Sequence, residues 1–141
     1  MIDIRNGDIK INDIYLYQGM PLEEFMLKYS SSIIKVIKNP IFEQYRLANQ
    51  NYNDYSLAIS AKFTDSKIKW VSLAPLLGNE TNFWDDWSEE RELKRLKIYE
   101  RFIEEEIGGF LKNGCLFFDW GNVYAAYDSK SATVNAGVNY K

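Results

Sequence analysis

Two segments of this 141-residue chain alternate strictly between apolar and polar side chains. In the first segment, the apolar positions are Tyr55, Leu57, Ile59, Ala61 and Phe63. In the second, near the end of the chain, they are Ala132, Val134, Ala136, Val138 and Tyr140. Alternation of this kind is typical of a strand with one buried and one solvated face. We therefore expect both segments to lie in a sheet that is covered on one side.

Shorter apolar runs predict the remaining strands. Asn6-Gly7 lies between two alternating runs, 2–4 and 9–11, and favours the positive φ angles of a tight hairpin turn. Residues 67–73 follow the turn Asp65-Ser66 and should return beside the first alternating strand, until Pro75 breaks the pattern. The other expected strands are 14–18, 33–37, 41–47, 115–118 and 122–127, while 49–54 reads as a polar loop.

Helical spacing appears in two places. Leu22, Phe25, Met26 and Tyr29 form one apolar stripe behind Pro21, which predicts a short helix over about 21–29. A second stripe predicts a long helix over about 86–107, ended by Gly108-Gly109. Strands cluster in groups around these helices, so the pattern indicates an α+β fold with a mostly antiparallel sheet, built as a single domain over residues 1–141.

Composition narrows the function classes. The net charge of −3 argues against nucleic acid as a partner, because a nucleic-acid binder needs a basic face. The single cysteine, Cys115, excludes an internal disulfide and lies in an apolar run, where we expect a small buried side chain. The first residues lack the pattern of a signal peptide, and no apolar run is long enough to cross a membrane. We therefore expect a cytoplasmic protein without a membrane partner.

Most catalytic chemistry has no candidate residues here. The chain contains no histidine, which removes Ser–His and Cys–His nucleophiles and the commonest zinc ligands. Its glycines do not form a phosphate-binding loop. We accordingly expect no enzyme activity, no cofactor and no metal. A carboxylate-dependent hydrolase stays open as an alternative, and it requires an acidic pair such as Asp119 and Asp128 to face one cleft.

An acidic, aromatic segment is the best candidate for a binding site. Between Glu80 and Glu92 there are six acids and one base, placed around Phe83 and two tryptophans. Large aromatic side chains supply contact area, and carboxylates steer a basic partner. The predicted partner-binding residues of this segment are Trp84, Asp85, Asp86, Trp87, Glu89 and Glu90. The alternative is structural: Asp86 caps the helix with Glu89 three residues on, and the tryptophans anchor it in the core.

The loop before the first alternating strand is a second candidate. Tyr52, Asp54 and Tyr55 contain two aromatic rings and one acid, and they extend the predicted partner-binding surface. The alternative is an ordinary polar loop with an Asx turn.

The C-terminal part of the chain resembles a known group of proteins. The pattern runs from Trp84-x-x-Trp87-x-x-Glu90 through a charged helix to Trp120-Gly121-x-Val123, Tyr127-Asp128-x-Lys130-Ser131 and Tyr140. Over residues 84–140 it is similar to small bacterial immunity proteins of contact-dependent inhibition and polymorphic toxin systems. This resemblance implies a non-enzymatic protein that binds and blocks a cognate toxin, with a basic, nuclease-type toxin domain as the expected partner. A small-ligand module or a structural subunit is the alternative, and it requires a closed apolar pocket.

Overall fold

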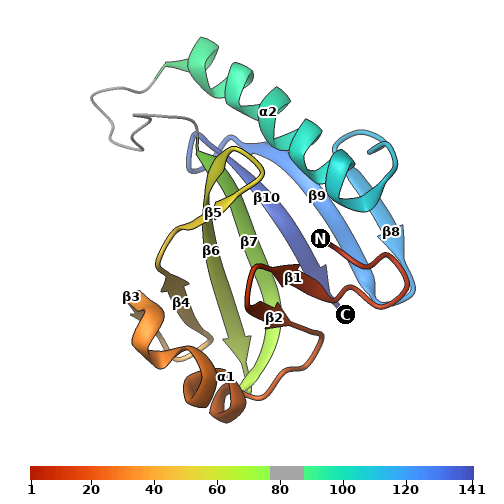
Figure 1. Ribbon diagram of the computed structural model, residues 1–141. Helices are drawn as coiled ribbons and strands as arrows, with labels where there is room; N and C mark the ends of the chain where they lie inside the picture. Colours follow the sequence, from red (N-terminus) through yellow and green to blue (C-terminus); the bar gives the residue numbers. More distant parts are fainter. Residues whose placement is uncertain (77–87) are drawn as a thin grey trace.

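The computed structural model describes residues 1–76 and 88–141, and its main element is an eight-stranded antiparallel sheet (Figure 1). The strand order is β3-β4-β6-β7-β10-β9-β8, and β5 pairs with β6 beside this path. The strands are β3 (Ile33–Lys38), β4 (Glu43–Leu47), β5 (Gln50–Tyr52), β6 (Tyr55–Thr64), β7 (Lys67–Leu76), β8 (Cys115–Phe118), β9 (Gly121–Asp128) and β10 (Thr133–Tyr140). The predicted α+β class with a mostly antiparallel sheet is confirmed.

The alternation of β6 assigns the two faces of the sheet. Leu57, Ile59, Ala61 and Phe63 are each at most 1% exposed, and the polar residues between them are half-buried. Directly paired residues of an antiparallel sheet lie on the same face. The pairing of Ile59 with Leu73 therefore places the buried residues of β7 on the same face as those of β6. We call the face that bears Ile59 the inner face and the face that bears Ser60 and Lys62 the outer face.

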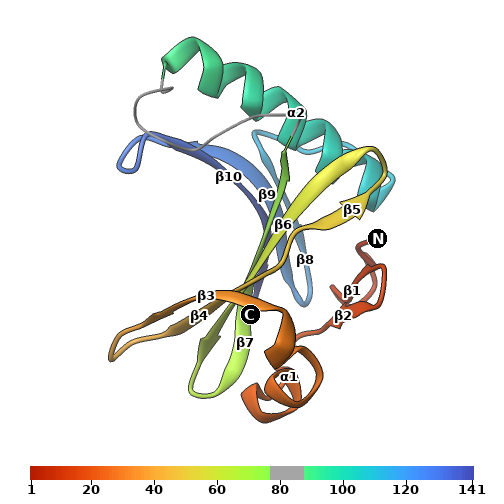
Figure 2. The same ribbon diagram turned by 60° about the vertical axis from the view of Figure 1, so that its left-hand side comes forward.

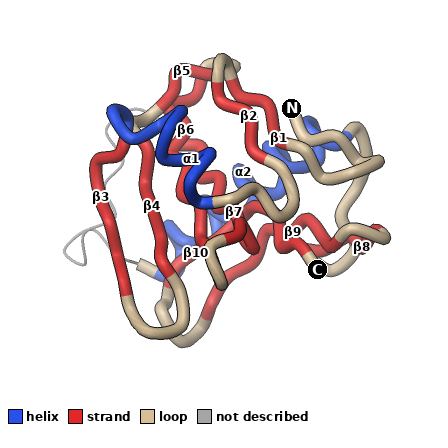
Figure 3. The backbone as a smooth tube through the Cα atoms, turned by 90° about the horizontal axis from the view of Figure 1, so that it is seen from below, coloured by secondary structure: helices blue, strands red, loops and turns tan. Residues whose placement is uncertain are grey.

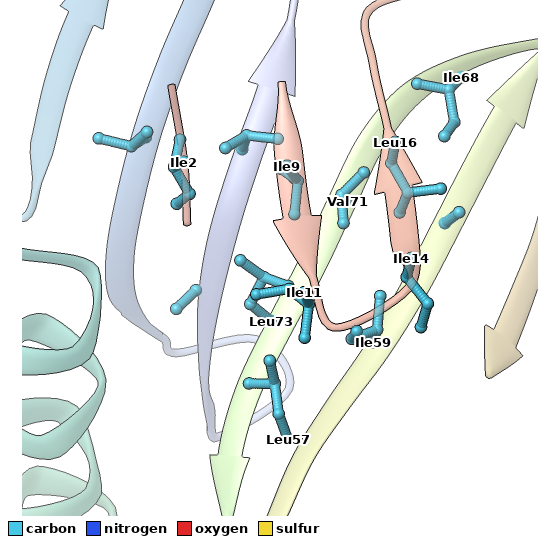
Figure 4. Packing of buried hydrophobic residues seen from close by; sticks show 14 of the residues in the cluster. Ile2, Ile9, Ile11, Ile14, Leu16, Leu57, Ile59, Ile68, Val71 and Leu73 are labelled. Carbon is cyan, nitrogen blue, oxygen red and sulfur yellow. The ribbon is translucent and has the colours of Figure 1, made fainter. Parts of the chain in front are cut away.

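A two-stranded hairpin covers part of the inner face. It consists of β1 (Ile9–Ile11) and β2 (Ile14–Leu16), whose isoleucines and leucine pack on β6 and β7 (Figure 4). The prediction of a hairpin around Asn6-Gly7 is only partly right. The chain does reverse there, with Gly7 at φ +81°, but one bridge between Ile2 and Ile9 is formed, and β1 pairs mainly with β2.

The loop at Gly7 is a docking element as well as a turn. The Gly7 carbonyl accepts a hydrogen bond from the Tyr140 hydroxyl at 2.6 Å, and Trp120 Nε1 donates to the Ile4 carbonyl at 2.8 Å. A Cβ atom on Gly7 would lie 2.6 Å from the Trp120 ring. Glycine is therefore needed here for both its φ angle and its small size.

Two helices complete the inner layer (Figure 2). The short helix α1 (Leu22–Tyr29) starts after Pro21, as predicted, and a 3₁₀ turn over Ser30–Ser32 follows it. The long helix α2 (Glu89–Ile107) packs on β9 and β10 and ends at Gly108, which is left-handed with φ +67°. The predicted cap at Asp86 is wrong, because Ser88 is the N-cap and its side chain accepts a hydrogen bond from the Arg91 amide. None of the helices in the described ranges has both the length and the hydrophobicity to cross a membrane.

Two segments differ from their predicted secondary structure. Pro75 does not break β7 but continues it, paired with Leu57. A proline is tolerated there because, within the described ranges, no strand pairs with β7 on its other side at that position. The segment expected as a polar loop over 49–54 contains the short strand β5, which forms a tight hairpin with β6.

The sheet splits between β7 and β10. These strands are paired at only three positions, from Gly137 with Ser72 to Asn139 with Trp70. Beyond Ser72 the two strands separate. Arg95 and Tyr99 of α2 line the gap between them. On the far edge, β8 contains Cys115, which is half-buried, and burial raises the pKa of its thiol.

Candidate partner-binding surface

Strand β3 is an exposed apolar edge of the sheet. It lies at the opposite side from β8 (Figure 3), and among the described residues its one partner strand is β4. Ile34, Val36 and Ile37 are 58%, 47% and 42% exposed, and the nearby Leu27 and Ile41 are more exposed still. An edge strand leaves backbone donors and acceptors unpaired, and contiguous exposed apolar residues mark interaction sites. This edge is suited to contact another protein.

The outer face beside β3 is basic. Lys35 pairs with Arg46, and Arg46 pairs with Ser60, so all three lie on the outer face. Lys62 lies on the same face, with its ammonium 4.4 Å from the centre of the Phe42 ring and 5.6 Å from that of Trp70. Cations held over aromatic rings keep their charge and present it to solvent or to a partner.

The positive charges of this face have few acids near them. Glu43 bonds to Lys38 at 3.7 Å, but by its pairing with Phe63 it belongs to the inner face. Within residues 1–76 and 88–141, no carboxylate lies within 4 Å of the charged groups of Lys35, Arg46 or Lys62. A chain with a net charge of −3 thus has a basic outer face. We call β3 and this outer face of β4, β6 and β7 the edge surface.

The described part of the predicted acidic patch lies at the start of α2. Glu89 and Glu90 are exposed in its first turn, where negative charge complements the helix dipole. Glu90 pairs with Lys94 at 3.5 Å. One turn on, Glu92 and Arg95 form an ion pair at 3.0 Å, and each side chain is only 4% exposed. Four predicted residues, Trp84, Asp85, Asp86 and Trp87, lie outside the described residues.

The predicted loop residues lie elsewhere and have structural contacts. Tyr52 and Tyr55 pack edge-on against Phe102 of α2, with ring centroids 6.4 and 5.6 Å away. The Tyr52 hydroxyl also donates to Glu106 Oε1 at 2.5 Å, and burial together with this bond raises the Tyr52 pKa. Asp54 is exposed in the turn between β5 and β6.

These tyrosines and the acidic patch are far apart along α2. Phe102 follows Glu89 by thirteen residues, which is roughly 20 Å of helix. The structure therefore does not bring the described candidates into one cluster, and the tyrosines hold the β5–β6 turn against the helix.

The predicted acidic pair, Asp119 and Asp128, does not face one cleft. Asp119 lies in the turn before β9 and Asp128 at the end of β9, so the strand separates them by roughly 25 Å. Asp128 accepts a hydrogen bond from the Lys130 amide at 2.9 Å, which lowers its pKa, as in an ordinary Asx turn. Among the described residues, no group of three or more potential metal-binding side chains is close enough to hold an ion.

Sequence reasoning missed the edge surface. The run Ile33-Ile34-Lys35-Val36-Ile37-Lys38 contains a signal, since its lysines interrupt the apolar residues on both faces of the strand. Charged side chains, lysine above all, are common on edge strands.

The comparisons with known proteins show a likeness of fold to one solved structure. No protein-family model matches the chain, and no curated protein matches it. Among solved structures, it is similar to a chain of Rhs1-CT in complex with cognate immunity protein RhsI1. The TM-score is 0.55 at 15% sequence identity, and the match covers 100% of this chain and 88% of that chain. At this identity the match shows a likeness of fold, which spans the entire chain.

Proposed function

We propose that this chain is an immunity protein, which binds and neutralises a cognate toxin domain by protein–protein contact. The observation that carries the proposal is the likeness of fold, over the full chain, to a chain from a complex of a toxin domain with its immunity protein. The edge surface supports it with an exposed apolar strand and an adjoining charged face. Neutralisation by contact needs no catalytic residue, cofactor or metal, because the inhibitor only has to cover the toxin.

The proposal extends to the kind of toxin. Acids at the start of α2 and the net charge of −3 favour a toxin with a basic active site, as nucleases have. The acidic patch, from Trp84 to Glu90, is then one part of the binding surface, and Tyr52, Asp54 and Tyr55 remain predicted contacts. We place the protein in the bacterial cytoplasm, where such a toxin meets its nucleic-acid substrate.

Co-expression with the toxin domain encoded beside its gene tests the proposal. We expect cells to survive induction of this toxin when the chain is present and to die when an unrelated immunity protein replaces it. In vitro, purified chain should bind a catalytically inactive form of the toxin in a calorimeter at a 1:1 ratio. Failure to bind this toxin or to protect the cells would overturn the proposal.

Stoichiometry separates a binder from an enzyme. A binding inhibitor abolishes toxin activity only when one copy is present for every toxin molecule. Complete inactivation at one copy per hundred toxin molecules would indicate turnover and contradict the non-enzymatic role.

A further inference from the structure

A small cavity with polar and apolar lining residues lies on the outer face, where β7 and β10 separate. Its volume is about 210 Å³, below the roughly 300–1,000 Å³ typical of small-molecule sites. Its polar lining includes Arg46, Ser60, Ser72, Arg95 and Asn135. This space is suited to one inserted side chain, and the lining is rich in hydrogen-bond donors.

The described residues give the cavity a positive charge. Arg95 forms an ion pair with Glu92, whereas Arg46 has no carboxylate within 4 Å among residues 1–76 and 88–141. Within the described residues, the Arg46 guanidinium donates one long hydrogen bond, from Nη2 to Asn49 Oδ1 at 3.4 Å. Its Nε atom is buried and has no hydrogen-bond partner among the described residues. A buried donor without a partner costs free energy, which a suitable acceptor would recover.

A carboxylate is the acceptor that fits this donor. The Nε and Nη2 atoms of one guanidinium form a planar fork that matches the two oxygens of a carboxylate. Ser60 pairs with both Arg46 and Ser72, which places two hydroxyls beside the fork on the same face.

The position of the cavity identifies the source of the carboxylate. Arg46 pairs with Lys35 of the exposed strand β3, so the cavity adjoins the edge surface. Arg95 follows Glu89 by six residues, roughly 9 Å along the helix, so the cavity also adjoins the acidic patch. An anchor placed between two parts of one binding surface is suited to the partner itself.

We propose that the Arg46 cavity receives an aspartate or glutamate side chain of the partner toxin. The inference rests on the proposed function. It adds that the partner must present an acidic side chain to the sheet, in addition to any basic residues that meet the acidic patch.

Arginine substitutions test this inference in the binding assay with the inactive toxin domain. We expect Arg46→Ala to weaken binding about 10- to 100-fold, and Arg46→Lys to recover only part of the loss, because an ammonium lacks the two parallel donors. The matched control is Arg101→Ala, which removes an exposed arginine of α2 and should change the affinity less than about twofold. The melting temperature of Arg46→Ala should not fall, since no bond within the fold depends strongly on this side chain.

A double-mutant cycle then locates the toxin's acid. Each aspartate and glutamate of the toxin is changed to its amide, and one such change should weaken binding to the wild type but not to Arg46→Ala. If both Arg46 variants bind like the wild type, the inference is overturned while the proposed function stands. If the wild type fails to bind the toxin, both are overturned. Arg46-dependent binding of inorganic phosphate without any effect on toxin binding would also overturn the inference.

Discussion

The edge surface and the acidic patch differ in how they are held. The apolar residues of β3 are fixed by strand pairing, and the neighbouring charges of Arg46 and Lys62 lie on a rigid sheet. Glu89 and Glu90 lie in the first turn of a helix, exposed and partly neutralised by Lys94. Rigid apolar contacts contribute most to affinity, whereas exposed charges contribute mainly to the rate of association. We therefore expect the edge surface to hold the toxin and the acidic patch to attract it.

The largest effect should come from the apolar edge. Changing both Ile34 and Ile37 to glutamate puts two charges where apolar contact is expected, and should weaken toxin binding about 100-fold, or ~2.7 kcal/mol. Both side chains are more than 40% exposed, so the fold should keep its melting temperature. Calorimetry with the inactive toxin measures the affinity, and circular dichroism measures the fold.

The opposite edge of the sheet provides the control. Phe117 of β8 is 77% exposed, and Phe117→Glu should leave toxin affinity unchanged. Equal losses from the two edges would mean that β3 has no special role and that added acid is simply unfavourable for binding.

A smaller effect is expected from the acidic patch. Changing Glu89 and Glu90 to lysine should lower the association rate about fivefold with little change in dissociation, and this difference should shrink at high salt. The helix should also lose about 0.3–1 kcal/mol per site, since positive charge opposes the dipole there. Glu105→Lys, near the other end of α2, is the matched control and should alter neither rate. A dominant change in the dissociation rate would place the main contact at the patch instead.

The smallest effect concerns a region away from both surfaces. The Tyr15 hydroxyl donates to Asp8 Oδ2 at 2.5 Å, and this hydrogen bond raises the pKa of Tyr15 from 10.0 to about 12. The folded state therefore favours the neutral phenol, so its stabilising contribution is complete below pH 10 and lost between pH 10 and 12. Urea unfolding should show a stability difference from Tyr15→Phe that is constant below pH 10 and declines above it. At pH 7 this variant should bind the toxin like the wild type. Weaker binding would indicate that the β1–β2 hairpin contacts the toxin.

Local patterns predicted most of the sheet but not its edges. The alternation of β6 and β10 identified the buried face, because burial on one face leaves a period of two in the sequence itself. Which strand ends the sheet depends on pairings between distant segments, such as Arg46 with Ser60. For this reason Ile33–Ile37 was recognised as a strand while its exposure was not.

The candidate site shows the same limit. Tyr52 and Tyr55 are residue types common in contact surfaces. Their rings nevertheless pack against Phe102, which is about fifty residues away in the chain. The Arg46 cavity requires Ser72 and Asn135 to approach across a split in the sheet. No local pattern encodes that approach. Ser88 was missed as the helix cap for a simpler reason, since acids on both sides of it compete as capping residues.

The single cysteine makes the molecule convenient to label. Cys115 is the one thiol of the chain, and it lies in β8, the strand farthest from β3 in the sheet order. Because burial raises the pKa of this thiol, the thiolate that reacts with maleimide dyes is scarcer than in an exposed cysteine, and labelling should be correspondingly slow. A fluorophore attached there would be remote from the edge surface, and could report on docking through energy transfer to a dye on the other protein without blocking it.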